Sequence, residues 1–299
     1  MHAANTLAFL DTEAVPVLSR GILRDWSWPV LPLVSLVVLA AVYLRGWLLA
    51  RRTRPAELPV WRAVCFFSGV LALWVAIASP IDALDDYLLA AHMIQHFILM
   101  SVAPPLMVLG APAVPLLRGL PRWVIRKPLH PFFASRMVQR ILHAVSHPIV
   151  IWLAMNVAYL GWHVPAAFEL TFRSEAWHNT EHLCFFLTST AFWWVVLQPW
   201  PSRPRWPRWT AIPYLLGADV VNTILSALLA FSGRVLYPSY AAAPRVSSLT
   251  PLQDQVAAGS EMWVLNSLVM LAPAVIITMH LLSPRYLREG SHAEPRYSR

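Results

Sequence analysis

The chain has 299 residues, of which 58% are hydrophobic and only 13% are charged, and its mean hydropathy is +0.54. A soluble domain carries about 25% charged residues, so this composition excludes an ordinary soluble globular protein. The formal net charge of +8 leaves two kinds of anionic partner to consider, nucleic acid and a membrane surface, and the positions of the cations along the chain distinguish them.

Apolar runs of the length needed to cross a bilayer, about 20 residues, recur along the chain. Polar or proline-rich joints separate them, and in lipid only helices satisfy the backbone of such long, uninterrupted segments. The sequence therefore predicts an all-α, polytopic membrane bundle of seven transmembrane helices, at about residues 29–49, 60–79, 88–109, 148–164, 178–198, 211–232 and 254–282.

Lysines and arginines are unevenly distributed among the joints. Most of them follow the first, third and fifth spans or lie in the tail, as Arg51, Arg126, Arg205 and Arg285 do. The opposite joints are acidic, with Asp82, Asp85, Asp86, Glu169 and Glu175. The positive-inside rule then predicts an N-terminus outside and a C-terminus in the cytoplasm. Because the cations are divided among short joints, the net charge indicates contact with membrane lipid and no nucleic-acid site.

The predicted domain organisation has three parts. Residues 1–28 form an extracytoplasmic segment, residues 29–284 the transmembrane domain and residues 285–299 a cytoplasmic tail. Within the second part, residues 130–146 carry apolar side chains on one side and arginines on another, which predicts a cytoplasmic interfacial helix. Cys65 and Cys184 should lie near opposite faces of the membrane, too far apart to form a disulfide.

Histidines gather at one end of the predicted spans. His92 and His96, and likewise His178 and His182, have the i, i+4 spacing that places two rings on one helix face. A single histidine at this depth would not indicate a site. His163 alone, for example, could belong with Trp162 to the aromatic belt at the membrane surface. The predicted topology, however, places all five histidines at the same depth near the outer surface. Ionisable groups inside a bilayer are costly, so a cluster of them indicates a functional site. The sequence predicts a metal or haem site near the outer surface.

The fifth span also contains an H-x-x-E-H pattern, formed by His178, Glu181 and His182. In inverzincins this pattern holds zinc with two histidines and uses the glutamate as general base. A membrane-embedded metal-dependent hydrolase is therefore one hypothesis. Glu181 could equally orient a histidine ring by a hydrogen bond without binding the metal. It could also simply stabilise the helix start, because acidic residues are favourable in a first turn.

Further polar or soft side chains accompany the histidines. Met100 lies one turn beyond His96, before two prolines that should kink the third span. Asp254, Glu261 and Met262 share a face of the seventh span, where Asp254 is equally well explained as a helix cap. Asp219 lies near the predicted midplane of the sixth span. Interhelical hydrogen bonding explains its polar neighbours more easily than it explains this carboxylate.

Several of these segments together resemble a known family. The segments HMIQHFILMSVAPPLMVLGAP, WHVPAAF, HNTEHLCFF with FWW following, LYPSY and DQVAAGSEMW occur in order from about residue 79 to residue 263. In this order they resemble the motifs of CtaG-type cytochrome c oxidase assembly factors, associated with caa-type oxidases. The recurring family residues that this chain shares are His92, Gln95, His96, Pro104, Pro105, His163, His178, Glu181, His182, Asp254, Gln255 and Trp263.

The resemblance implies a bacterial inner-membrane protein that helps a haem-copper oxidase to mature, with copper placement the usual inference. The predicted roles of Glu261 and Asp219 come from their position in apolar spans alone and not from the resemblance. Imidazole suits copper, zinc, iron and nickel, while nearby thioether favours Cu(I). The leading hypothesis is thus a non-enzymatic assembly factor that binds copper, with zinc possible, and passes it to an oxidase subunit. The alternatives are the hydrolase and a haem-b electron carrier with histidine axial ligands.

Overall fold

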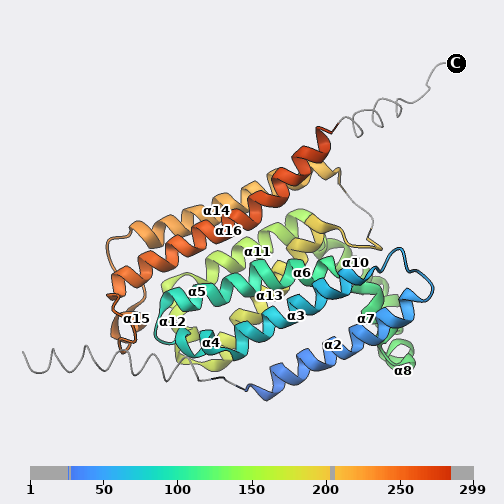
Figure 1. Ribbon diagram of the computed structural model, residues 1–299, viewed down its shortest axis with the longest axis horizontal. Coiled ribbons are helices and arrows are strands. Elements are labelled where there is room, and N and C mark those ends of the chain that lie inside the picture. Colours follow the sequence, from blue (N-terminus) through green and yellow to red (C-terminus); the bar gives the residue numbers. More distant parts are fainter. Residues whose placement is uncertain (1–25, 27, 203–205, 284–299) are drawn as a thin grey trace, which may run out of the picture.

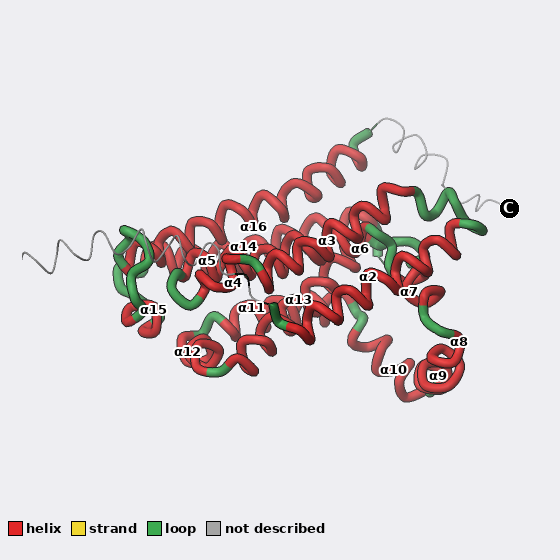
Figure 2. The backbone as a smooth tube through the Cα atoms, turned by 60° about the horizontal axis from the view of Figure 1, so that its bottom comes forward, coloured by secondary structure: helices red, strands yellow, loops and turns green. Residues whose placement is uncertain are grey.

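The computed structural model describes residues 26, 28–202 and 206–283. Of the predicted outer segment 1–28, only Trp26 and Trp28 therefore fall within the described residues, and the predicted tail 285–299 lies outside them. Every regular element in the described part is helical (Figure 2), which confirms the all-α class.

Seven helical stretches occupy the positions of the predicted spans. They are α2 (Val30–Arg51), α3 (Val60–Ala78), the continuous run of α5 (Leu89–Phe97), the π-helix η1 (Ile98–Val102) and α6 (Ala103–Leu109), then α11 (Pro148–Trp162), α13 (Glu175–Leu197), α14 (Ala211–Phe231) and α16 (Pro251–Leu281). Shorter helices join them: α4 (Pro80–Asp85), α7 (Ala113–Gly119), α8 (Arg122–Val124), η2 (Ile125–Leu129), α9 (His130–Ala134), α10 (Arg136–Val145), α12 (Pro165–Arg173), η3 (Arg208–Thr210) and α15 (Pro238–Ala242).

Local sequence explains where several of these helices begin. Pro148, Pro165 and Pro251 occupy the first turns of α11, α12 and α16, where a missing N–H breaks no helical hydrogen bond. At α16, Thr250 and Gln253 also form a reciprocal capping box. These signals are local, so the sequence alone was sufficient to place the boundaries within a few residues.

Pro104 and Pro105 lie in a run that contains a π-helical segment, Ile98–Val102. A proline at position 104 cannot donate to the carbonyl four residues earlier, which belongs to Met100. That carbonyl instead accepts a hydrogen bond of 3.1 Å from the indole N–H of Trp193 on α13. The aromatic segment of α13 therefore satisfies the backbone group that the prolines leave free.

Length and composition qualify five helical segments to cross a membrane: Val30–Arg51, Val60–Ala78, Leu89–Leu109, Arg208–Phe231 and Pro251–Leu281. The pair α10 and α11, bent by 67°, would add a sixth as a broken span. Helix α13 is not among these candidate spans, because polar residues in its first turns lower its hydropathy. Seven spans, and the orientation of the termini, accordingly stay predictions.

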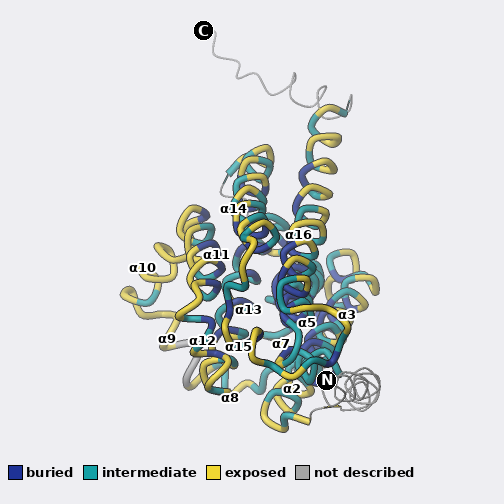
Figure 3. The backbone as a smooth tube through the Cα atoms, turned by 90° about the vertical axis from the view of Figure 1, so that its left-hand side faces the viewer, coloured by how far each residue is buried: buried dark blue, intermediate teal, exposed yellow. Residues whose placement is uncertain are grey.

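The outward faces of the long helices are strongly apolar. On α14 the side chains of Val220, Ile224 and Phe231 are 58%, 56% and 75% exposed, and α2 and α16 carry similar rows. Figure 3 places the buried residues in the middle of the bundle, on α5 and α13, and the exposed ones on its periphery. Apolar surfaces of this extent are rare on soluble monomers, whereas lipid covers them without cost.

Two hydrophobic clusters build the interior. One joins α5, α11, α13, α14 and α16, and the other joins α2, α3, α6 and α7. α14 and α16 run side by side (Figure 1). Helix α2 approaches α7 so closely that a Cβ atom at Gly46 would lie 1.7 Å from the carbonyl oxygen of Pro115. The short helices α4, α12 and α15 lie at one end of the bundle, and α7, α8 and α10 lie at the other (Figure 1).

The predicted interfacial segment 130–146 forms two helices, α9 and α10, which meet at Ser135. Phe132, Phe133 and Met137 are 57%, 47% and 71% exposed. The segment projects from the bundle at the end opposite α12 and α15 (Figure 2). Cys65 and Cys184 are both free, as predicted.

Candidate metal centre

The five histidines come together at the end of the bundle where α4, α12 and α15 lie. His92 and His96 extend from α5, and their ring centroids are 4.2 Å apart. His178 and His182 form a similar pair on α13, with centroids 4.1 Å apart. The pairs face each other, with 5.4 Å between the rings of His92 and His178. His163, at the end of α11, lies 6.0 Å from His96.

Glu181 reaches the centre of this group from α13. Its side chain is fully buried, with Oε1 3.8 Å from Nε2 of His96 and Oε2 4.0 Å from Nε2 of His92. Its position between the two α5 histidines is set by the i+3 step from His178, which places both residues on the same face of α13.

Asp85, the last residue of α4, approaches the other edge of the group. Its Oδ2 atom lies 3.9 Å from Nδ1 of His92 and 3.6 Å from Nε2 of His178. From the sequence, Asp85 was predicted to lie in an acidic outer joint and was not among the predicted site residues. One feature of the sequence could have indicated Asp85: it lies in the joint directly before the histidine pair of α5.

We call these seven residues the histidine–carboxylate cluster: His92, His96, His163, His178, His182, Asp85 and Glu181. Two groups within it have ligand atoms all within 4.8 Å of one another, namely Asp85 with His92 and His178, and His92 and His96 with Glu181. Each group contains two histidines and a carboxylate. The five histidines were predicted as the ligands and Glu181 as a supporting residue; in the structure Glu181 and Asp85 each complete one group.

Buried atoms of the cluster lack hydrogen-bond partners in the described part of the chain. They are Oδ2 of Asp85, both carboxylate oxygens of Glu181, Nε2 of His92, His163, His178 and His182, and both ring nitrogens of His96. Burying so many polar atoms unpaired is costly. Separations of 3.6–4.0 Å are too long for hydrogen bonds. They fit ligands around a common cation, which would satisfy the unpaired atoms.

Asp85 lies in the joint between two spans. Burial, and after it the charge of the neighbouring Asp82, raises the pKa of the Asp85 carboxyl well above its usual range. Without a cation nearby this carboxyl therefore favours its neutral form. A positive charge at the cluster would reverse that preference and make the carboxylate a competent oxygen ligand.

Backbone contacts hold the cluster residues in place. Nδ1 of His163 lies 2.7 Å from the carbonyl oxygen of Tyr159, so Nδ1 carries the proton and Nε2 is left free as a ligand atom. Tyr237 donates to the His163 carbonyl at 3.0 Å, and Tyr240 donates to the Asp85 carbonyl at 2.6 Å. Both tyrosines belong to the LYPSY segment, to which residue-level reasoning gave no role.

Three predicted supporting residues position helices around the cluster. Gln95 donates to the Ala76 carbonyl at 2.9 Å and to Oδ1 of Asp82 at 3.0 Å, which ties α5 to α3 and α4. Asp254 accepts hydrogen bonds from the first turn of α5. Gln255 accepts from the Leu236 N–H and donates to the Leu229 carbonyl, and so fixes the loop after α14.

The other predicted supporting residues lie outside both ligand groups. Met100 and Met262 are buried in the hydrophobic cluster that joins α5 to α16. Asp219 on α14 accepts a hydrogen bond of 2.7 Å from the Ser267 hydroxyl on α16. Glu261 is partly buried on α16, and its Oε2 atom has no hydrogen-bond partner in the described residues.

A polar network connects His163 with the middle of the bundle. The Tyr159 hydroxyl donates to Oδ1 of Asn222 at 2.8 Å, and Asn266 donates to the same oxygen at 3.3 Å. Asn266 in turn accepts from the Ser101 hydroxyl at 2.6 Å. The network satisfies polar groups from four helical segments, and it connects the orientation of His163 to the packing of α14 against α16.

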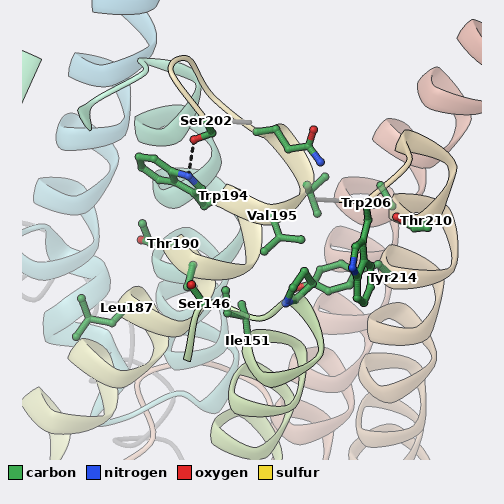
Figure 4. A pocket seen from close by; sticks show the side chains of 15 residues that line it. Ser146, Ile151, Leu187, Thr190, Trp194, Val195, Ser202, Trp206, Thr210 and Tyr214 are labelled. Atoms are coloured by element: carbon green, nitrogen blue, oxygen red, sulfur yellow. Dashed lines mark hydrogen bonds between the residues drawn. The ribbon is translucent and has the colours of Figure 1, made fainter. Parts of the chain in front are cut away.

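An apolar cavity of about 500 Å³ lies between α11, α13 and α14, at the end of the bundle opposite the cluster. Figure 4 places Trp194, Trp206 and Tyr214 around it together with Ile151 and Val195. Its lining includes no charged side chain in the described part of the chain. This cavity therefore offers no chemistry that competes with the cluster for a cation.

Comparison with known proteins identifies a matching family and several relatives. The family model described as cytochrome c oxidase caa3 assembly factor (Caa3_CtaG) matches residues 41–283, which include all seven cluster residues. Uncharacterized proteins of Mycobacterium bovis and Mycobacterium tuberculosis are each 27% identical over 295 residues, covering 95% of this chain and 43% of the relative. An uncharacterized protein of Mycobacterium leprae is 23% identical over 286 residues, covering 91% of this chain and 42% of the relative.

The chain thus spans less than half the length of these curated relatives. No solved structure matches it. The family model extends from the middle of α2 to the end of α16 and confirms the resemblance drawn from the motifs. The chain belongs to the cytochrome c oxidase caa3 assembly factor family.

Proposed function

We propose that the histidine–carboxylate cluster binds copper and delivers it to a subunit of a haem-copper oxidase. The observation that carries this proposal is the set of unpaired nitrogen and oxygen atoms, contributed by α4, α5, α11 and α13 and buried at ligand-like separations. Family membership supplies the assembly role, and the cluster supplies a chemical step by which the protein would contribute to assembly.

The ligand types bear on which metal is bound. Imidazole and carboxylate groups suit Cu(II) and Zn(II), whereas Cu(I) favours soft sulfur ligands. Both ligand groups consist of histidines and carboxylates alone. We therefore propose copper in its Cu(II) form as the cargo, with zinc as the competing ion that a metal analysis must include.

The same proposal places the protein in the bacterial inner membrane as a multi-pass protein. Helix α7, which carries Arg118, lies at the end opposite the cluster (Figure 1), and Arg118 donates to the Thr53 hydroxyl in the joint after α2. With the positive-inside rule, this supports a cytoplasmic position for that end and an outer position for the cluster. Copper would then be exchanged at the outer surface, with an oxidase subunit as the partner.

The direct test is the metal content of the purified protein after incubation with Cu(II) and removal of loosely bound ions. We expect copper in the unaltered protein and none in the variant in which all five cluster histidines are alanine. His143→Ala, which removes an exposed histidine of α10, is the matched control and should keep its copper. An unaltered protein that holds no copper would contradict the proposal.

A cellular test follows from the same site. The double variant His92→Ala and His96→Ala makes its segment more apolar and should still insert. The oxidase should then be made with its haem but be deficient in copper, and excess external copper should partly restore activity by mass action. Full copper occupancy per haem in oxidase from this strain would leave only a scaffolding role for the protein.

The H-x-x-E-H motif keeps a metal hydrolase as the second candidate function, because Glu181 lies beside the α5 histidines. A hydrolase would use Glu181 as general base, whereas the copper proposal makes it a ligand. A haem-b carrier is tested by the absorption spectrum of the purified protein, since a reducible Soret band would be required.

A further inference from the structure

The imidazole ring of His92 stands between two carboxylates. Its Nδ1 atom lies 3.9 Å from Oδ2 of Asp85, and its Nε2 atom lies 4.0 Å from Oε2 of Glu181. His92 is also the residue that the two ligand groups share. Each ring nitrogen thus faces a different carboxylate and a different second histidine: His178 beside Asp85, and His96 beside Glu181.

We infer that the cluster holds two cations that share the His92 ring, one at the Asp85 position (Asp85, His92, His178) and one at the Glu181 position (Glu181, His92, His96). A ring that binds a cation through each nitrogen is an imidazolate, so His92 releases its ring proton to solvent when the second ion binds. This inference rests on the proposed metal-binding function and adds to it the number of ions and the ligands of each.

The separations favour metal ligands over an orienting hydrogen bond. Neighbouring ligands on an ion with bonds of about 2.0–2.1 Å lie about 2.9 Å apart in square-planar and about 3.3 Å apart in tetrahedral geometry, and the four contacts span 3.6–4.0 Å. Shortening of these four contacts by about 0.3–1.1 Å would bring them to the spacing of metal ligands. A carboxylate that merely oriented His92 would accept a hydrogen bond from Nδ1, and 3.9 Å is too long for that.

The two remaining histidines lie close to both positions. The His182 ring lies 4.1 Å from that of His178 and 5.5 Å from that of His96, and the His163 ring lies 6.0 Å from that of His96. Each keeps an Nε2 atom without a hydrogen-bond partner in the described residues. Two positions therefore use both carboxylates, whereas a single ion leaves at least one carboxylate buried and unpaired.

The test is copper stoichiometry combined with the electron paramagnetic resonance of the whole chain in detergent, loaded with Cu(II) alone. We expect about two copper ions per chain. Because a shared imidazole couples the two unpaired electrons, the resonance signal should account for much less copper than the metal analysis finds. Asp85→Asn should hold one copper ion with a signal that accounts for all of it, and Glu181→Gln should lose the other position.

Each altered residue has a matched control variant on the same segment. Asp86→Asn and Glu175→Gln neutralise exposed carboxylates on the same segments and should keep both ions and the weakened signal. One ion per chain, unchanged by Asp85→Asn, would overturn the inference while leaving the proposed function intact. Two ions with an uncoupled signal would overturn the sharing of His92. No copper in the unaltered protein would overturn the proposed function itself.

Discussion

The carboxylate of Asp254 accepts a hydrogen bond of 2.7 Å from the backbone N–H of Leu89. A second bond, of 3.1 Å, comes from the N–H of Ala90. Asp254 lies in the first turn of α16 but caps α5, the helix that carries His92 and His96. Helix N-termini leave backbone donors unsatisfied and favour negative charge. One buried side chain therefore connects the long C-terminal helix to the position of the metal centre.

We predict that Asp254→Ala lowers both stability and copper affinity. Loss of a cap costs about 0.5–2 kcal/mol, and the freed first turn of α5 would no longer hold His92 in register. Thr250→Ala is the matched control, because it removes the cap of α16 itself. Thermal unfolding in detergent should show a similar loss for both variants, while copper titration should show weaker binding for Asp254→Ala alone. Equal copper affinity in the two variants would contradict this role for Asp254.

Glu181→Gln distinguishes a ligand from a general base. If Glu181 holds a cation with His92 and His96, the neutral amide should reduce bound copper, because a carboxylate oxygen is the stronger ligand. A hydrolase would instead keep its metal and lose turnover. Metal analysis of the variant beside Glu175→Gln, an exposed glutamate in the first turn of α13, makes the comparison. Retention of all the metal together with loss of a measurable hydrolytic activity would favour the enzyme.

Gly46→Ala should destabilise the contact between α2 and α7. The added Cβ atom would lie 1.7 Å from the Pro115 carbonyl oxygen, so the two helices must separate. Overpacking of this kind costs about 1–3 kcal/mol, occasionally more. Gly161→Ala on α11 meets no atom within 4 Å and should be neutral or gain up to about 1 kcal/mol. The temperature of unfolding in detergent should fall for the first variant only, and equal values would argue against a close α2–α7 contact.

Asp219→Ala should impair oxidase maturation more than Ser226→Ala does. Asp219 is a half-buried carboxylate on α14 that accepts a 2.7 Å hydrogen bond from the Ser267 hydroxyl. A carboxylate inside a membrane helix lowers stability, so its presence indicates a functional role. Ser226 is buried, and its hydroxyl donates to Oδ1 of Asn222 at 3.5 Å. Asp219→Asn should keep the bond to Ser267 and hence the stability, without restoring maturation. Wild-type oxidase activity in the Asp219→Ala and Ser226→Ala strains alike would make Asp219 a packing residue.

Much of the helical framework could be predicted from residues close together in the chain. The second span was expected at 60–79 and forms Val60–Ala78; the sixth was expected at 211–232 and forms Ala211–Phe231. Apolar run length, prolines at first turns and polar joints are local properties, so no knowledge of the packing was needed. The sequence also predicted that the histidines would gather, because alternating helices return His92, His163 and His178 to one end of the bundle.

Contacts between distant segments were beyond local reasoning. In the sequence Asp85 is one of several acids in a joint. Its approach to His92 and to His178 depends on how α4 packs against α5 and α3. Tyr240 secures the Asp85 carbonyl from 155 positions along the chain. Asp254 looked like a cap for its own helix, yet the donors that it satisfies belong to α5.

The sequence by itself thus determined where the helices lie and which end carries the imidazoles, because hydrophobic length and periodicity act over a few turns. Only the tertiary structure decided which carboxylates meet those imidazoles and which atoms remain unpaired. The physical reason is that buried polar atoms take their partners from whatever helix packs nearest, and that choice depends on side-chain volumes and close approaches, such as that of Gly46 to Pro115, summed over the whole bundle.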